Sequence, residues 1–390
     1  MLSPGSNVEW ENPAKQLNYL VLSDIHLGNR QCPPSHMTAG LRTYFHQFSD
    51  GSPFTKLDIL FIAGDLFDKA LYLSGEDTHT IFRFLKDLMS WCAKHKVRLR
   101  VLEGTPSHDR AQFRAFLPMA ESFTTLDFRY IETMCVEAFY DLQVTCLYVP
   151  DEFGGSAEAS QKLIDKEFQS LGIRQVSFAI MHGMFRYQVP ELASDRFKYE
   201  EQFFFDRVKG FINIGHVHVF TTFGRILCQG STDRICHGEE AAKGGIMVTW
   251  DPSGDRNFFF IENKSAMVFT TVHIRIKELE EALARAEKRI AGLPDGSHVR
   301  IKAAKGHPVL NVLEHLERKY PGLIFDRITE EEERERNQLI DTQAVLDTNY
   351  VPVNIHAGNI VDMIMAEAKP SLDVSAPTMI RIVSTLQGLV

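Results

Sequence analysis

The stretch LDILFIAGDLFD, residues 57–68, decides the fold class. Its apolar run ends at Ala63 and is followed directly by Gly64 and Asp65. A short apolar run bounded by polar residues is typical of a strand buried on both faces, as in the parallel sheets of α/β proteins. The stretch therefore predicts a buried strand that carries Asp65 at its end.

Other stretches between Asn18 and Asn263 have the same construction, an apolar run that ends in a polar cluster. They are NYLVLSD (18–24), VRLRVLEG (97–104), VSFAIMHG (176–183) and GFINIGH (210–216). Residues 81–95, IFRFLKDLMSWCAKH, have the spacing of a crossover helix between two of these strands. Strands that alternate with helices indicate an α/β fold. After Gly215 the apolar runs are divided by Gly, Pro and Asp turns, so we expect antiparallel strands there.

The strand patterns also divide the chain. Residues 1–17 form an N-terminal extension, residues 18–263 hold the strands above, and residues 264–330 alternate as a small β-α-β-α-β unit. Residues 331–390 begin in a charge run and end in two short amphipathic helices separated by Pro370. The apolar faces of these helices fit self-packing, a dimer contact or docking onto a partner.

The composition restricts the class of protein. The chain has 390 residues, 44% of them hydrophobic, and a net charge of -9, which argues against a polybasic binder. A nuclease is not excluded, because bound divalent cations reverse the local field. No segment approaches the ~20 apolar residues of a membrane span. Residues 1–16 have neither a basic nor an apolar region of the kind that signal peptides have, so we do not expect them to form one. The six cysteines form no CxxC pair, so we expect reduced thiols in a cytoplasmic protein and no structural zinc site.

Candidate metal ligands follow five of the predicted strands. They are Asp24 and His26, Asp65, His108 and Asp109, His182, and His216 and His218. Sites in open α/β sheets form at the carboxyl ends of strands, and alternation in an extended segment turns both side chains of a D-x-H or H-x-H pair to one side. Mixed carboxylate and imidazole ligands favour Mn, Fe or Zn. We expect two cations ~3.5–4 Å apart, bridged by Asp65.

These motifs carry a resemblance. DIH, GDLFD, GTPSHD, MHG and GHVH follow the order of the motifs in calcineurin-like metallophosphoesterases, with GTPSHD in the place of GNHD. The resemblance covers roughly residues 18–263. Residues 227–245, LCQGSTDRICHGEEAAKGG, are similar to the segment that closes the nuclease core of SbcD-type DNA exonuclease subunits. The family implies a four-layer sandwich, two packed mixed sheets flanked by helices, with a small α+β capping domain.

The resemblance also implies roles for the site residues. One cation would be held by Asp24, His26, Asp65 and His218, and the other by Asp65, His182, His216 and the residue at position 107. Ser107 stands where the family has asparagine, and a turn residue without a metal is an equally good interpretation of it. His108 corresponds to the histidine that stabilises or protonates the leaving oxygen, and Asp109 would orient its ring.

The expected function follows from the same resemblance. It implies an Mn-dependent DNA exonuclease with endonuclease activity in recombination or repair, with Mg, Fe or Zn as alternative ions. It also implies a homodimer and an SbcC-type coiled-coil ATPase partner that docks on the C-terminal helices. The alternatives are a phosphomonoesterase, a cyclic-nucleotide phosphodiesterase, or a non-catalytic subunit that binds DNA ends or the ATPase.

Polar residues near the motifs have simpler alternatives. The candidate contacts to DNA phosphates are basic side chains, each of which could equally be ordinary solvated charge: Arg30, Lys69, Arg110, Arg186 and Lys243. Asp68 is expected to fix a loop beside the ligands. Asp233 and Glu239 are expected to be turn and surface residues, and His36 a surface or structural histidine.

Overall fold

The computed structural model describes residues 2–48, 56–71, 75–188, 197–311 and 313–334. The first of its sheets has six strands. Their order is β12 (Arg256–Glu262), β11 (Gly244–Trp250), β1 (Leu17–Leu22), β2 (Ile59–Ala63), β3 (Arg98–Leu102) and β4 (Phe128–Ile131). Strands β1 to β4 run parallel, whereas β11 pairs antiparallel with both β1 and β12. The strand predicted from residues 57–68 is therefore confirmed as a parallel strand inside a sheet.

The second sheet also has six strands. Their order is β5 (Cys135–Phe139), β6 (Val144–Val149), β7 (Phe178–His182), β8 (Ile212–Gly215), β10 (Ile226–Cys228) and β9 (Thr221–Phe223). Strands β6, β7, β8 and β10 are parallel, and the edge strands β5 and β9 are antiparallel to their neighbours. The antiparallel pairing expected after Gly215 is confirmed for β11 and β12, whereas β10 is antiparallel to β9 but parallel to β8. The chain reverses at Gly224, so β10 runs back beside β8 in the direction of β8.

The two six-stranded sheets pack face to face. Tyr19 on β1 stacks on Phe178 on β7, with the ring centroids 4.8 Å apart, inside a core that includes Phe61 and Trp250. The neighbouring residue Leu20 points to the opposite face of its sheet and packs in another core. Both faces of β1 and β2 are thus buried, which explains why their sequences are continuously apolar.

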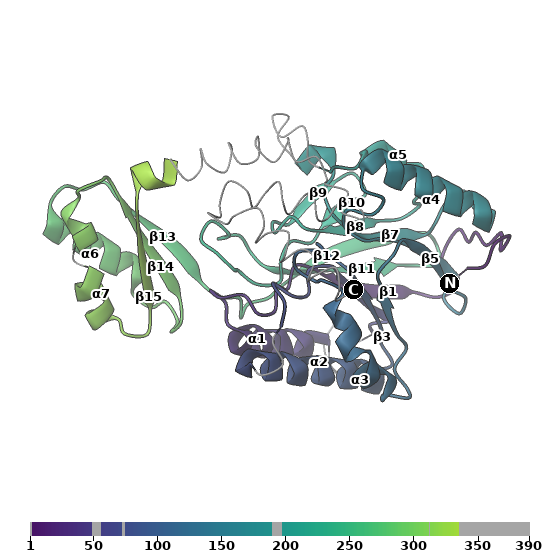
Figure 1. Cartoon of the computed structure of the whole chain (residues 1–390), viewed down its shortest axis with the longest axis horizontal. Coiled ribbons are helices and arrows are strands. Elements are labelled where there is room, and N and C mark those ends of the chain that lie inside the picture. The colour runs from purple at the N-terminus through teal and green to yellow at the C-terminus, as the bar shows by residue number, and fades with distance from the viewer. Residues whose placement is uncertain (1, 49–55, 72–74, 189–196, 312, 335–390) are drawn as a thin grey trace, which may run out of the picture. The chain divides into compact units, whose positions relative to one another are not determined.

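Helices cover the outer face of each sheet (Figure 1). On the first sheet lie α1 (Pro34–Phe45), α2 (Glu76–His95) and α3 (Leu117–Glu121), and on the second lie α4 (Ala157–Leu171) and α5 (Glu201–Phe205). Short 3-10 helices lie at His46–Phe48, Gln112–Phe116, Arg186–Gln188 and Pro308–Asn311. The predicted crossover helix lies within α2. Its first turn carries Glu76 and Asp77 and its last turn Lys94 and His95, which complements the helix dipole.

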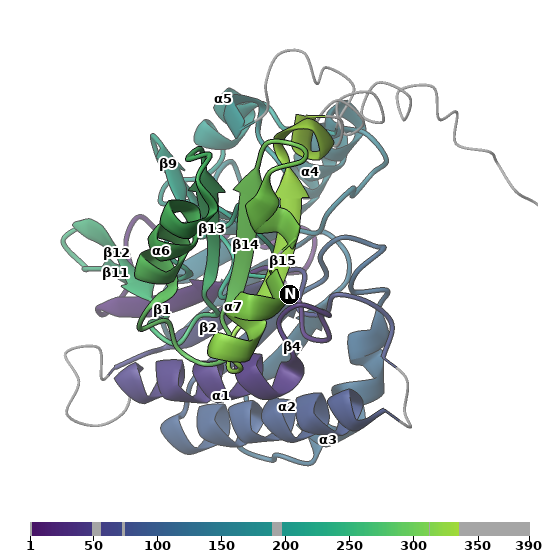
Figure 2. The same cartoon turned by 90° about the vertical axis from the view of Figure 1, so that its left-hand side faces the viewer.

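A third sheet is built from the residues after 264 (Figure 2). Its strands are β13 (Phe269–Ile274), β14 (His298–Ala303) and β15 (Ile324–Thr329), with α6 (Leu279–Ile290) and α7 (Leu313–Lys319) between them. These elements follow the predicted β-α-β-α-β order and share a core of their own. All three strands are parallel, so this part is α/β, and the α+β description was wrong.

The predicted C-terminal helices fall on residues 335–390 and lie outside the described residues. Among the residues that the structure describes, no helix is long and apolar enough to cross a membrane.

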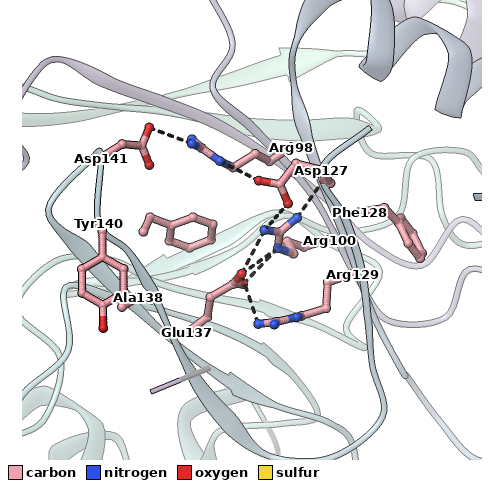
Figure 3. A pocket seen from close by; sticks show the side chains of 10 residues that line it. Arg98, Arg100, Asp127, Phe128, Arg129, Glu137, Ala138, Tyr140 and Asp141 are labelled. Carbon is pink, nitrogen blue, oxygen red and sulfur yellow. Dashed lines mark hydrogen bonds and ion pairs between the residues drawn. The ribbon is translucent and has the colours of Figure 1, made fainter. Parts of the chain in front are cut away.

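A cluster of ion pairs joins the two large sheets (Figure 3). Arg100 on β3 is 4% exposed, and its Nε and Nη2 atoms each donate to the Glu137 carboxylate on β5 at 2.9 Å. Arg100 also donates to Asp127 at 2.8 Å, and the Tyr148 hydroxyl donates to Glu137 at 2.8 Å. Each buried charge therefore has a partner, and the cluster fixes β3 of one sheet to β5 of the other.

Candidate metal centre

The predicted Asp and His ligands converge at the carboxyl ends of the strands. One group consists of Asp24, His26 and His218, and the other of Asp65, His182 and His216. Within each group, one nitrogen or oxygen atom from every residue lies within 4.8 Å of the others. These residues follow β1, β2, β7 and β8, so both large sheets contribute to the centre.

Asp65 connects the two groups. Its Oδ2 atom lies 3.8 Å from Nε2 of His26 and 3.4 Å from Nε2 of His182. In the first group, His218 Nε2 lies 3.6 Å from Asp24 Oδ1 and 3.1 Å from His26 Nε2. Two imidazole nitrogens this close repel each other unless a proton or a cation lies near them. The donor set and its spacing therefore fit two divalent cations with Asp65 between them.

The backbone at these residues is strained. Asp24, His26 and Asp65 have φ values of 50°, 54° and 49°, and His216 has a φ of 99°. Non-glycine residues rarely adopt positive φ, and such residues persist only where the surroundings enforce them, often at functional sites. The alternation argument for the D-x-H pair was therefore wrong. Asp24 and His26 lie beyond the end of β1 in left-handed turns, and these turns bring their side chains together.

Two glycines allow the loops to approach this closely. A Cβ atom on Gly64 would lie 2.2 Å from Nδ1 of His182, and one on Gly104 would lie 2.1 Å from the backbone nitrogen of Asp65. His182 Nδ1 is also 2.7 Å from the carbonyl oxygen of Ala63, which accepts its proton. That hydrogen bond directs Nε2 toward Asp65, as expected for a metal-binding imidazole.

Asp65 and His182 shift each other's pKa. Burial alone would raise the pKa of Asp65, but His182 and His26 hold it below its usual range. Burial would lower the pKa of His182, yet the Asp65 carboxylate raises it well above the usual value. The negative charge of Asp65 is thus matched by positive charge on the neighbouring ring. A cation that binds here would displace that proton, since only neutral imidazole binds metal.

The loop after β3 supplies Thr105 to the centre and leaves Ser107 outside it. The Thr105 amide donates to Asp65 Oδ1 at 2.6 Å, and its hydroxyl oxygen lies 3.1 Å from Oδ2 atoms of both Asp65 and Asp151. The same hydroxyl is 3.4 Å from ring nitrogens of His182 and His216. Ser107 is exposed. The position predicted for Ser107 is therefore occupied by Thr105.

The turn geometry explains the difference. The amides of His108 and Asp109 both donate to the carbonyl oxygen of Thr105, at 2.9 and 3.1 Å. Pro106 and Ser107 lie at the outside of this turn and are exposed to solvent. The Ser107 carbonyl accepts a hydrogen bond from Arg110. The residue after Gly104, rather than the residue before His108, is the one that meets Asp65.

His108 lies beside the first group. Its ring centroid is 4.9 Å from that of His26 in an edge-to-face contact, and its Nδ1 is 2.8 Å from the carbonyl oxygen of Asp68. The Asp68 side chain lies 3.4 Å from His26 Nδ1 and accepts a hydrogen bond from Asn29. Asp68 therefore fixes the loop, as predicted.

Asp109 does not contact the His108 ring, so the predicted orienting role was wrong. Its carboxylate accepts the amides of Phe67 at 2.9 Å and Gly104 at 2.7 Å. Burial and the charge on Asp65 raise the pKa of Asp109 to about 7. Asp109 therefore holds the loops after β2 and β3 together, and the Asp68 carbonyl orients the imidazole.

Asp151 and Glu239 are polar residues at the centre that the sequence prediction missed. Asp151 follows β6, and its Oδ2 lies 3.7 Å from Nδ1 of His216. The apolar run VTCLYVPD resembles the other ligand-bearing strands, and that pattern could have revealed Asp151. Glu239 Oε1 accepts from His218 Nδ1 at 2.6 Å, and Oε2 accepts from Lys243 Nζ at 3.0 Å. The predicted surface position of Glu239 was wrong, and Lys243 is 1% exposed, which rules out a DNA contact.

Replacing Glu239 with glutamine should weaken metal binding about 10–100-fold, the usual cost of losing a carboxylate that orients a metal-binding histidine. His218 and Lys243 overcome the effect of burial and lower the pKa of Glu239 to about 2, so the carboxylate is charged at neutral pH. Titration with Mn2+ measures the affinity. Glu262→Gln, at an exposed position, is the matched control. Equal Mn2+ affinity for the two variants would show that Glu239 does not support metal binding.

Three of the four remaining candidate DNA contacts share one pocket. Arg30, Lys69 and Arg110 line a hollow together with Gly28 and Leu71. Lys69 follows Asp68 and Arg110 follows Asp109 in the sequence, so this hollow adjoins the loops of the centre. Arg186 does not line it and forms an exposed ion pair with Glu200 instead.

Comparisons with known proteins do not identify the chain. No family model matches it, and no curated protein matches it. Among solved structures 39 chains match. One of these, a crystal structure, has 11% sequence identity and a TM-score of 0.37, and the match covers 63% of this chain and 99% of that chain. A similarity this low carries no argument about function. The chain is an α/β protein with mixed sheets and helices.

Proposed function

We propose that the protein is a divalent-metal-dependent phosphodiesterase that cleaves DNA, as an exonuclease with endonuclease activity in recombination or repair. The observation that carries the proposal is the pair of Asp/His groups joined by Asp65. The motif order and the packing of helices on two mixed sheets support a four-layer sandwich of the calcineurin-like metallophosphoesterase family. The basic pocket beside the centre favours a substrate with several phosphates.

Two cations fit the residues present. Asp24, His26, Asp65 and His218 would hold one, and Asp65, His182 and His216 would hold the other. Thr105 and Asp151 offer the second cation oxygen atoms in place of Ser107. Mixed imidazole and carboxylate ligands favour Mn2+, with Mg2+, Fe2+ or Zn2+ as alternatives. When bound, such ions lower the pKa of water and stabilise negative charge on a phosphate.

The side chains of the protein supply the remaining chemistry. The Asp68 carbonyl accepts the Nδ1 proton of His108 and so fixes the ring beside the first group. In its protonated form, His108 can donate its other proton to the leaving oxygen of a phosphodiester. Arg30, Lys69 and Arg110 would bind the phosphates of the strand and fix its position.

Replacing Arg30 or Arg110 with alanine should weaken DNA binding by a similar factor for every sequence. Each substitution should also reduce the slope of log affinity against log salt by about 1, because one phosphate contact is lost. Fluorescence anisotropy with duplex DNA at several salt concentrations, in a His108→Ala background that blocks cleavage, measures the slope. Lys166→Ala on the exposed face of α4 is the control. An unchanged slope of log affinity against log salt in both arginine variants would show that the pocket does not bind DNA phosphates.

Thr105→Val should raise the Mn2+ concentration needed for half-maximal cleavage about tenfold, since the hydroxyl beside Asp65 and Asp151 is lost. Ser107→Ala should leave the requirement within about twofold of the wild type. Mn2+ titration of DNA cleavage measures both variants. If only Ser107→Ala needed more Mn2+, Ser107 and not Thr105 would be the ligand of the second cation, as predicted from the sequence.

Assays in Mn2+ with linear duplex DNA, a nitrophenyl phosphate and cyclic nucleotides separate the classes of function. The proposal predicts cleavage of DNA. Turnover of a small ester with intact DNA would indicate a phosphomonoesterase or a cyclic-nucleotide phosphodiesterase, and inertness toward all three would indicate a non-catalytic subunit. The homodimer and the SbcC-type ATPase partner stay proposals, because the C-terminal helices lie outside the described residues.

A further inference from the structure

The described residues contain two further groups of candidate metal ligands. His26, Asp68 and His108 share His26 with the centre, whereas the third group shares no residue with it. This third group consists of Cys32, His36 and Asp233, whose sulfur, nitrogen and oxygen atoms all lie within 4.8 Å of one another. They come from the loop after β1, the first turn of α1 and the segment after β10. Thiolate, imidazole and carboxylate are the ligands that Zn2+ takes in proteins. Cys32 and His36 have a C-x3-H spacing that the sequence analysis did not use, and Asp233 is too far away in the sequence to be connected with them by spacing.

Two buried atoms in this group have no hydrogen-bond partner among the residues that the structure describes. Asp233 is 3% exposed, and its Oδ1 accepts the amides of Arg234 and Met267 at 2.7 and 2.6 Å. The two atoms are Oδ2 of Asp233 and Nε2 of His36. Buried polar atoms without a partner are rare and costly. The prediction that Asp233 and His36 are ordinary turn and surface residues therefore leaves both atoms unexplained.

The spacing of these atoms suits a cation better than a hydrogen bond. His36 Nε2 and Asp233 Oδ2 are 3.7 Å apart, too far for a hydrogen bond. Ligands bound to zinc at about 2.0–2.3 Å in a tetrahedron lie roughly 3.3–3.8 Å from one another. The loop is also held in place, because the Cys32 amide donates to Asn29 Oδ1 at 3.2 Å.

We propose that Cys32, His36 and Asp233 bind a structural Zn2+ ion, with water as the fourth ligand. The His36 side chain is 34% exposed although its Nε2 atom is buried, and the water ligand would enter along this side chain. The Cys32 thiol would release its proton to solvent on binding, since the thiolate is the ligand. One thiolate and one carboxylate then neutralise the two charges of the ion. Mn2+ suits this group poorly, because thiolate is a soft ligand.

The position of the third group indicates a structural role for the ion. Asp233 precedes Glu239 in the segment that carries the carboxylate on His218. An ion shared by Cys32, His36 and Asp233 would fasten this segment to the start of α1. The ion would thereby hold Glu239 against His218 and support one end of the Asp/His centre without taking part in the reaction.

Cobalt substitution tests the site directly. The full chain is stripped with a chelator and titrated with Co2+, which shows a near-ultraviolet charge-transfer band only when a thiolate binds it. Neither Asp/His group contains a cysteine, so the band reports the third group alone. We expect the band in the wild type, its loss on adding Zn2+ and its absence in Cys32→Ser. Cys236→Ser removes the one exposed thiol and should keep the band.

The melting temperatures of the metal-free proteins show whether the Cys32→Ser variant folds. Metal-free Cys32→Ser should melt as the metal-free wild type does. Zn2+ should raise the melting temperature of the wild type more than that of Cys32→Ser, because the Asp/His groups are present in both. His36→Asn should weaken Co2+ binding at this site at least tenfold. A wild type without the band, or a band that persists in Cys32→Ser, would overturn the proposal. The result is independent of the proposed function, because Mn2+-dependent DNA cleavage tests the Asp/His groups and the cobalt band does not.

Discussion

Asp65→Asn is expected to lower Mn2+-dependent DNA cleavage about 1,000-fold or more while the protein stays folded. The Asp65 carboxylate faces His26 and His182 from opposite groups, at 3.8 and 3.4 Å. Asparagine keeps the shape of the side chain and one oxygen atom but loses the charge that two cations would share. Losing a bridging carboxylate removes both charge stabilisation and the spacing of the ions, which together supply much of the rate in two-metal sites.

Cleavage of linear duplex DNA, circular dichroism and metal content measure the effect of Asp65→Asn. Asp87→Asn on the exposed face of α2 is the matched control, because it removes an exposed carboxylate whose ion pair among the described residues is with Arg42. We expect the control to cleave DNA at the wild-type rate. If Asp65→Asn retained a tenth of that rate or more, Asp65 would not bridge two catalytic ions.

Arg100→Met is expected to destabilise the protein by about 3–5 kcal/mol, the typical cost of leaving a buried partner charge uncompensated. Glu137 would lose both hydrogen bonds from Arg100 in a place where its side chain is 8% exposed. Arg129 and Tyr148 would stay as its nearest partners. Urea denaturation followed by circular dichroism measures the free energy of unfolding.

Arg98→Met gives the matched control for Arg100→Met. Arg98 is 21% exposed and pairs with Asp127 and Asp141, both 55% exposed, so its loss should cost less than about 1 kcal/mol. The double variant Arg100→Met with Glu137→Leu should regain part of the stability, because no unpaired charge is then buried. Equal costs for Arg98→Met and Arg100→Met would show that the cluster does not join the sheets.

The sequence predicted the strands and the convergence of their ends for a simple reason. Buried parallel strands need continuous apolar runs, and the carboxyl ends of neighbouring parallel strands lie at one edge of a sheet, so Asp24 and Asp65 were expected to lie close together. Asp65 and His182 belong to different sheets, and only the resemblance predicted that these sheets pack together. The resemblance added the order of the motifs. These two arguments together predicted that six Asp and His side chains lie close to one another, and the structure brings these six together in two groups.

Local turn geometry could not be predicted in the same way. The choice between Thr105 and Ser107 depends on a turn whose amides fold back onto the Thr105 carbonyl. Asp24 and His26 adopt left-handed backbone conformations that no alternation rule includes. Contacts between segments that are distant in the sequence could not be predicted either. Glu239 on His218, and Asp233 near Cys32 and His36, arise only when the segment after β10 packs beside the loop after β1.

Anomalous scattering from crystals grown with Mn2+ can locate the cations. We expect two peaks about 3.5–4 Å apart, one beside Asp24, His26 and His218 and the other beside His182 and His216, with Asp65 between them. Crystals in Mn2+ that show no peak among these side chains, or coordinates in which the six side chains point to separate places, would contradict this expectation.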